Sequence, residues 1–149
     1  SVRQLVDEVL QLTRSLTPPD AAISTDVADD LLIDVDHQRF QQVLINLLQN
    51  AADVIGSGGR IHIDARRENN GTRLSVADNG PGIAPEDLPR IFDPFFSTKA
   101  VGKGTGLGLF IVHEIIGQHG GTVSVDSQPG QGTRFSIHIP DQKKTENPQ

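Results

Sequence analysis

The stretch HQRFQQVLINLLQNAADVI, residues 37–55, has the clearest helical period in the chain. Its apolar side chains recur at the spacing that places them on one face of an α-helix: Phe40, Val43, Leu44, Leu47, Leu48 and Ala51. The glycine-rich residues 56–59 end the pattern. The stretch therefore predicts a long helix with one buried face, against which the rest of the fold can pack.

Shorter patterns on either side of this helix predict further helices and strands. Residues 1–16 have near-helical apolar spacing before a pair of prolines, and residues 106–117 predict a second apolar helix. Strand-like stretches follow the period of two or lie between turn residues, at 22–27, 31–35, 60–65, 72–77, 121–125 and 134–139. The last two stretches are typical of a closing hairpin. We find no internal repeat.

Composition limits the function classes. A chain of 149 residues suffices for one globular domain with its own core but not for two. The formal charge of −6 argues against a surface that follows nucleic-acid phosphates or an anionic membrane, because both need clustered cations. The absence of cysteine excludes a disulfide framework, a thiolate zinc site and a cysteine nucleophile. We expect neither a membrane span nor a signal peptide, and Ser1 in place of a methionine suggests a fragment of a longer protein.

Three polar side chains lie along one side of the predicted long helix. Asn46 and Asn50 are four residues apart and share a face, which Asp53 extends. A solvated helix face is the simpler explanation of this spacing alone. The functional alternative is a magnesium site, because Mg²⁺ prefers oxygen ligands and takes several of them from water and nucleotide phosphates.

Asp78 follows the predicted strand at 72–77 and opens the sequence DNGPGI, in which Gly80 and Gly82 let the backbone turn sharply. A carboxylate at a strand end can accept a hydrogen bond from an exocyclic amine such as that of adenine. A plain turn is the alternative, but a hairpin would return directly into a strand. Residues 78–103 instead stay rich in Gly, Pro and Asp, with at most one short helix near 86–91, so we expect a mobile lid.

A glycine loop, GKGTGLGL at residues 102–109, runs directly into the second predicted helix. Successive backbone amides and the positive end of a helix form an anion site suited to phosphates. The loop is not a P-loop, because Lys103 is followed by Gly104, and it lacks the spacing of a dinucleotide fingerprint. A flexible linker is the alternative. A second glycine turn, GQGT, ends in Thr133, whose hydroxyl is a candidate for the site.

Aromatic and basic side chains in the expected lid have two explanations each. Phe92, Phe95 and Phe96 form a cluster that either anchors the lid to the domain or belongs to its core. Lys99 and Lys103 flank the glycine loop, where each either meets a phosphate or remains solvated.

Taken in order, NLLQNA, DNGPGI, IFDPFFSTK, GKGTGLGL and GQGT resemble the N, G1, F, G2 and G3 boxes of the histidine-kinase catalytic domain. That domain belongs to the ATPase superfamily shared with gyrase, heat-shock protein ninety and MutL. The resemblance covers residues 31–140, and five boxes in sequence make it specific. The sequences of the F and G2 boxes are most similar to those of the nitrogen-regulation and dicarboxylate-sensing kinases.

The resemblance implies an α/β fold of the Bergerat, or GHKL, type: a two-layer α+β sandwich with a mixed sheet, helices on one face and an ATP lid. It also implies the division of the chain. Residues 1–16 would be a helical linker from an acceptor-helix domain, residues 17–140 the ATP-binding catalytic domain, and residues 141–149 a disordered tail.

Carried over residue by residue, the resemblance implies ATP and Mg²⁺ as cofactors. Asn50 would be the magnesium ligand and Asp78 the carboxylate that reads adenine. The implied phosphate cradle consists of Gly104, Gly106 and Gly108. The other positions that the resemblance places around the nucleotide are Asn46, Asp53, Gly80, Gly82, Ile83, Lys99, Lys103, Thr105, Leu107 and Thr133. Asp53 stands where some kinases of the family carry a lysine.

The implied reaction is transfer of the γ-phosphate to a histidine. Asn46 stands where the hydrolytic relatives have a glutamate that activates water, and an amide has no basicity for this role. None of the five histidines shows the family's acceptor pattern of a histidine, an acidic residue and a proline four further on; His113 before Glu114 comes nearest. We therefore expect the acceptor histidine and its base upstream of Ser1, with no catalytic residue in this fragment.

The implied partners are the acceptor-helix (dimerisation) domain of the same protein and the receiver domain of a response regulator, with a homodimeric full-length protein. We expect the domain in the cytoplasm, without nucleic acid and without direct membrane contact, whether or not its parent is anchored in the inner membrane. Two alternatives remain: an ATP hydrolase of the same superfamily, and a nucleotide-sensing module without transfer activity.

Overall fold

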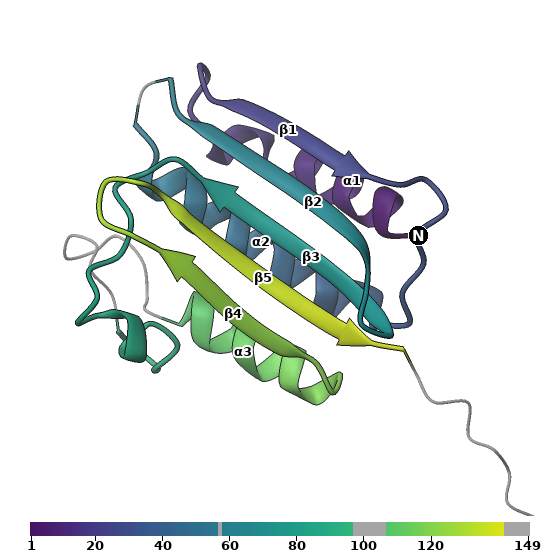
Figure 1. Cartoon of the computed structure of the whole chain (residues 1–149). Helices are drawn as coiled ribbons and strands as arrows, with labels where there is room; N and C mark the ends of the chain where they lie inside the picture. Colours follow the sequence, from purple (N-terminus) through teal and green to yellow (C-terminus); the bar gives the residue numbers. More distant parts are fainter. Residues whose placement is uncertain (57, 97–106, 142–149) are drawn as a thin grey trace, which may run out of the picture.

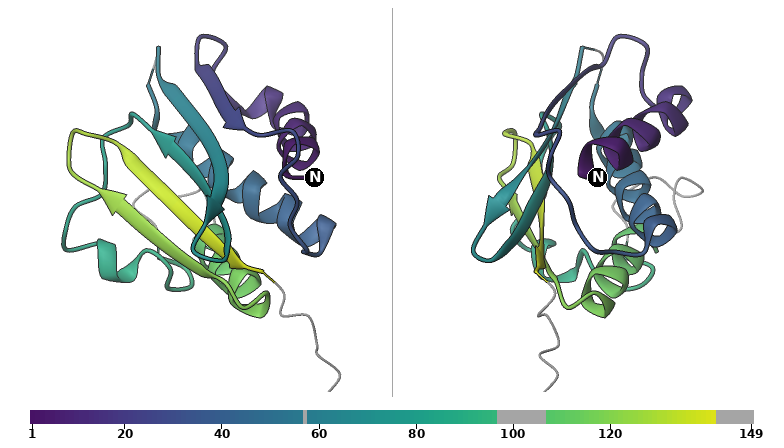
Figure 2. Two further views of the ribbon diagram at one scale, coloured as in Figure 1. Left: turned by 45° about the vertical axis from the view of Figure 1, so that its right-hand side comes forward. Right: turned by 90° about the vertical axis from the view of Figure 1, so that its right-hand side faces the viewer.

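The structure, a computed structural model, describes residues 1–56, 58–96 and 107–141. Its sheet has the strand order β1-β2-β3-β5-β4, with β1 parallel to β2 and the other neighbours antiparallel. The strands are β1 (Ala22–Val27), β2 (Arg60–Glu68), β3 (Gly71–Asp78), β4 (Thr122–Ser127) and β5 (Thr133–Pro140). Three helices, α1 (Val2–Leu12), α2 (His37–Val54) and α3 (Gly108–Gln118), cover one face of this sheet (Figures 1 and 2). The expected two-layer sandwich with a mixed sheet is confirmed.

The long helix α2 is the centre of the helix layer. Asp36 caps its first turn by accepting a hydrogen bond from the Arg39 amide at 3.0 Å, which satisfies one of the free helix donors. All six residues of the predicted apolar stripe are buried. The helix also forms the crossover between the parallel strands β1 and β2, a connection that normally requires a helix.

Helix α1 belongs to the same hydrophobic core. Its inward face buries Val2, Leu5, Val6 and Val9, each at most 2% exposed. The helix ends at Leu12, earlier than the predicted 1–16, and a short 3₁₀ helix, η1 (Arg14–Leu16), follows it. The expected boundary between a linker at 1–16 and a domain at 17–140 stays a prediction, because the packing of α1 in the core does not by itself define where the domain begins.

The strand predicted at 31–35 is wrong. After β1 the chain turns, with the Leu31 amide donating to the Ala28 carbonyl at 3.3 Å, and the Leu31 carbonyl accepts from the Val2 amide at 3.0 Å. In the described part of the chain this segment pairs with no strand of the sheet. Its apolar alternation arises because Leu31, Ile33 and Val35 pack against the core while the chain crosses to α2.

The remaining elements agree with the predictions. The β2–β3 hairpin turns through Asn69 and Asn70, which both have positive φ angles, the backbone form of a tight hairpin turn. Strands β4 and β5 form the expected closing hairpin. The short helix expected near 86–91 is a single 3₁₀ turn, η2 (Leu88–Arg90). The tail beyond residue 141 lies outside the described residues. No helix among those described is long and apolar enough to cross a membrane.

Candidate nucleotide-binding site

Asp78 is the last residue of β3 and faces the helix layer. The Gly80 amide donates to its Oδ1 atom at 2.9 Å, and the backbone amide of Thr133, its partner on β5, also donates to the carboxylate. Burial raises the pKa of Asp78, and these two hydrogen bonds oppose the rise. The result is a half-buried carboxylate with acceptor capacity left for a ligand.

The loop after Asp78 is held close to this carboxylate. A Cβ at position 80 would lie 3.0 Å from the Asp78 Oδ1 atom, so glycine leaves the carboxylate accessible. Gly82 has φ +79°, and a Cβ there would lie 2.2 Å from the Gln128 carbonyl oxygen. Ile83 packs its half-buried side chain against the core. Gly80, Gly82 and Ile83 thus lie in one loop beside Asp78, and their roles toward a nucleotide stay predictions.

A second loop, residues 128–132 between β4 and β5, packs against the first. The Gly130 amide donates to the Pro81 carbonyl at 2.6 Å. Thr133 is buried, and its hydroxyl lies 2.9 Å from the Ser127 hydroxyl. Sequence reasoning missed Ser127, although a hydroxyl at the last position of a strand, just before a glycine turn, is a recognisable feature.

Residues on one face of α2 reach two other parts of the site. The Asn46 side-chain amide donates to the carbonyl of Gly108, the first residue of α3, at 3.3 Å. Two helical turns further on, Val54 Cγ2 would lie 3.0 Å from a Cβ on Gly80. Because positions four apart share a helix face, Asn50 lies on α2 between these two contacts. We call Asn46, Asn50 and Val54 the site row of α2.

The Asn50 side chain is half-buried and makes no hydrogen bond with the residues that the structure describes, so its oxygen can accept a ligand. Asp53 is exposed and interacts within the chain. Among the described residues no group of three or more His, Cys, Asp or Glu side chains could hold a metal. A single amide oxygen fits Mg²⁺ when phosphates and water supply the other ligands.

Helix α3 begins opposite Asn46. Leu107 precedes its first turn without a side-chain cap, and a Cβ on Gly108 would meet no atom of the described residues within 4 Å. Backbone amides at a helix start fit an anion. The other predicted phosphate contacts, at Lys99, Lys103, Gly104, Thr105 and Gly106, lie outside the described residues and stay predictions.

The aromatic cluster divides into different environments. The Phe92 ring lies against His113 of α3, with 5.5 Å between centroids and a tilt of 40°, and meets Phe135 of β5 edge to face at 6.3 Å, so it packs against the domain. Phe96 lies under the Arg90 guanidinium, 4.8 Å from its ring centroid. Phe95 is 75% exposed.

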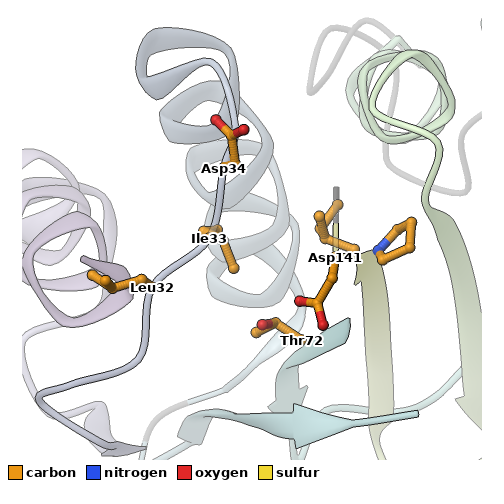
Figure 3. A pocket seen from close by; sticks show the side chains of 7 residues that line it. Leu32, Ile33, Asp34, Thr72 and Asp141 are labelled. Carbon is orange, nitrogen blue, oxygen red and sulfur yellow. The ribbon is translucent and has the colours of Figure 1, made fainter. Parts of the chain in front are cut away.

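A pocket of about 370 Å³ lies away from all of these residues (Figure 3). It is lined by Thr72 near the start of β3 and by residues 139–141 at the end of β5, whereas Asp78 and Thr133 lie at the other ends of these strands. Residues 32–34 close its remaining side. No predicted site residue lines it.

A half-buried carboxylate at a strand end, two glycine loops beside it and a helix start opposite an amide-bearing helix are features typical of a nucleotide-binding α/β domain. Residues 35–143 match the family described as histidine kinase-, DNA gyrase B- and HSP90-like ATPases. The sensor histidine kinase ZraS of Escherichia coli (strain K12) is 46% identical over 124 residues, which cover 82% of this chain and 26% of ZraS. The chain thus spans about a quarter of the length of that relative.

Solved structures agree with this match. Full-length ShkA in complex with AMPPNP superposes with a TM-score of 0.83 at 33% identity, covering 94% of this chain and 30% of ShkA. Histidine kinase ThkA in complex with the response regulator protein TrrA superposes with a TM-score of 0.79 at 32% identity, covering 95% of this chain and 41% of ThkA. The chain belongs to this ATPase family, and its fold is similar to that of the catalytic domains of histidine kinases.

Proposed function

We propose that this domain binds ATP with Mg²⁺ and transfers the γ-phosphate to a histidine on an acceptor helix of the same protein, which passes it to the receiver domain of a response regulator. Asn46 carries this proposal. It lies on the site row of α2, and its side chain is an amide that donates to the Gly108 carbonyl. A group without basicity cannot activate water, which leaves transfer to a protein acceptor.

The described residues fit the adenine base of ATP. Asp78 retains acceptor capacity for the adenine amine, and Gly80 keeps the approach to the carboxylate open. Asn50 would hold Mg²⁺ through its amide oxygen, and the chemistry that this ion supplies when bound is neutralisation of phosphate charge. The backbone amides at the start of α3 would orient the phosphates. The contribution of the chain is therefore positioning and electrostatics.

Four of the five histidines make hydrogen bonds or ion pairs that suit structural roles. His119 accepts from the Asp36 amide through Nε2 at 3.1 Å, so its Nδ1 must donate to the Ile115 carbonyl at 2.8 Å. His62 and His138 bond within the sheet, and His37 lies 3.2 Å from Glu8. His113 lies against Phe92. These contacts support an acceptor outside this chain.

The proposal also covers the partner domains of this chain and its location in the cell. ThkA was solved with a response regulator protein, which supports a receiver domain as the final phosphate acceptor here. The acceptor helices would make the full-length protein a homodimer, and the need for ATP favours the cytoplasm. An ATP hydrolase would require a base near Asn46, and a nucleotide-sensing module would bind ATP without transferring phosphate.

Incubation with γ-labelled ATP and magnesium, followed by gel autoradiography, tests the proposal. The domain alone should remain unlabelled and release little phosphate, whereas acceptor helices from its parent protein, supplied separately, should become labelled. Transfer should be slow, because two parts supplied as separate molecules lack the high effective concentration that a covalent connection gives. Strong labelling of the domain by itself, or rapid phosphate release, would contradict the proposal. ATP binding with no labelled helices would favour the sensing module.

A further inference from the structure

The hydroxyl of Ser127, the last residue of β4, meets three groups of the nucleotide site. Its Oγ atom accepts from the Ile83 amide at 2.8 Å. The same oxygen lies 3.0 Å from the Gly132 carbonyl and 2.9 Å from the Thr133 hydroxyl. One small side chain thus connects the loop after Asp78 with the turn before β5.

The directions of these hydrogen bonds follow from chemistry. A carbonyl oxygen only accepts, so the single Ser127 hydroxyl hydrogen points to Gly132. In the arrangement that satisfies both contacts, the Ser127 oxygen accepts from Thr133, and the Thr133 hydroxyl hydrogen is used in that bond. The Thr133 hydroxyl can therefore only accept a hydrogen bond from a ligand.

Thr133 and Asp78 face the same ligand space. They are direct partners in the β3–β5 register, and partners across antiparallel strands place their side chains on one face about 4.5–5.5 Å apart at Cβ. A Cβ on Gly132 would lie 2.1 Å from the Asp78 carbonyl oxygen, so the two strands approach closely here. The carboxylate and the hydroxyl therefore present two acceptors side by side.

We propose that Ser127 is a positioning residue that determines base specificity: it fixes the Thr133 hydroxyl as an acceptor and holds the Ile83 loop beside it. This inference rests on the assignment of the site to ATP. Adenine carries an amine with two hydrogens at position 6, and hypoxanthine carries a carbonyl there. A site with two acceptors favours the amine, and removal of the Ser127 hydroxyl frees the Thr133 hydrogen to donate to a carbonyl.

The experiment compares dissociation constants of ATP and ITP, because the shared triphosphate cancels in their ratio. In Ser127→Ala the ratio of the ITP to the ATP constant should fall about three- to tenfold, the effect of one neutral hydrogen bond. Ser127→Thr keeps a hydroxyl and should therefore retain the wild-type ratio. Ser124→Ala is the matched control, because Ser124 is an exposed residue of the same strand. Ser127→Cys keeps the shape and replaces the alanine variant if that one does not fold.

Circular dichroism without nucleotide separates folding from specificity. If Ser127→Ala or Ser127→Cys weakens both nucleotides equally, or changes neither, the inference is wrong while ATP binding by the wild type still supports the proposed function. A wild-type domain that binds neither nucleotide would overturn both. A selective loss of discrimination, rescued by threonine and absent in Ser124→Ala, supports Ser127 as the positioning residue.

Discussion

Asp78 shows how one side chain combines a cost to folding with a role in binding. Its burial raises its pKa, since a charge loses solvation there, and the Gly80 and Thr133 amides compensate only in part. A carboxylate kept in such a place at neutral pH is typical of binding sites. Substitution of Asp78 therefore tests whether this side chain reads the base.

Asp78→Asn should bind ATP roughly tenfold to over a hundredfold more weakly, because a charge-assisted hydrogen bond contributes about 1.5–3 kcal/mol. The fold should persist, since an amide oxygen can still accept from Gly80. Calorimetric titration with ATP measures the loss, and denaturant unfolding without nucleotide checks the fold. Wild-type affinity in this variant would show that Asp78 does not read the base.

For the same carboxylate we predict two opposite pH dependences, one of the affinity for ATP and one of its contribution to the stability of the free protein. ATP binding needs the ionised form, so affinity should fall on acidification at a pH above about 3.9, where an exposed aspartate titrates. For the free protein, the raised pKa means that Asp78 stabilises the fold at low pH and that this contribution is lost as pH rises through the folded-state value. The phosphates of ATP titrate in every variant, so Asp78→Asn is the control. An identical acid profile in that control would contradict the assignment.

Asn50→Ala should weaken the binding of magnesium nucleotide by about tenfold or more, the scale on which side chains around metals act. Binding of ATP with EDTA should change little, because only the metal depends on the amide oxygen. Gln49→Ala, an exposed neighbour on α2, is the matched control. Equal losses with and without magnesium would assign Asn50 to packing.

At the scale of elements, the site arises where two loops and two helices meet. Asn46 connects α2 to the start of α3, and His119 connects the end of α3 to the start of α2, so these helices run antiparallel. The loop after β3 is held in turn by the loop between β4 and β5. The close approach of these loops depends on glycines.

Gly82 and Gly130 form a matched pair for testing that approach. Their φ angles are +79° and +80°. An added Cβ at Gly82 would lie 2.2 Å from the Gln128 carbonyl oxygen, whereas one at Gly130 would meet no atom of the described residues within 4 Å. Gly130→Ala should lower the free energy of unfolding by about 1–2 kcal/mol, the cost of the left-handed backbone. Gly82→Ala should cost more and also weaken ATP binding. Equal effects in urea unfolding and ATP titration would show that the loops do not touch.

At the scale of the whole molecule, α1 and the sheet share one core. Four α1 side chains are buried with the stripe of α2, although the sequence resemblance assigns residues 1–16 to a linker. Buried aliphatic surface of this kind stabilises whichever unit contains it. The domain should therefore unfold as a single cooperative unit that includes α1.

Leu5→Ala should lower the free energy of unfolding by about 2–5 kcal/mol, because Leu5 is 2% exposed in the core. Leu12→Ala, on the same helix but 60% exposed, should stay within about 0.5 kcal/mol of the wild type. Urea unfolding followed by circular dichroism compares them. Similar small costs at both positions would mean that α1 is only loosely attached.

Much of the fold could be predicted because its patterns are local. The apolar stripe of α2 follows from a helical period, and β1 covers the predicted residues 22–27. The segment 31–35 shows the limit: alternation indicates which side chains are buried but not whether the backbone pairs with a strand. For the candidate site, Asp78, Gly80 and Gly82 lie in one short motif, and the structure places them beside Thr133, while their roles toward a nucleotide stay predictions.

The sequence by itself determined the class of domain, the helix that carries Asn46 and Asn50, and the strand end that carries Asp78, because these depend on residue type and local spacing. Only the tertiary structure decided that Ser127 joins Ile83 to Thr133, that Asn46 meets Gly108 and that α1 completes the core. Those contacts depend on strand register and helix packing between residues distant in the chain. Strand register and helix packing result from many weak interactions between distant residues, and no local pattern encodes them.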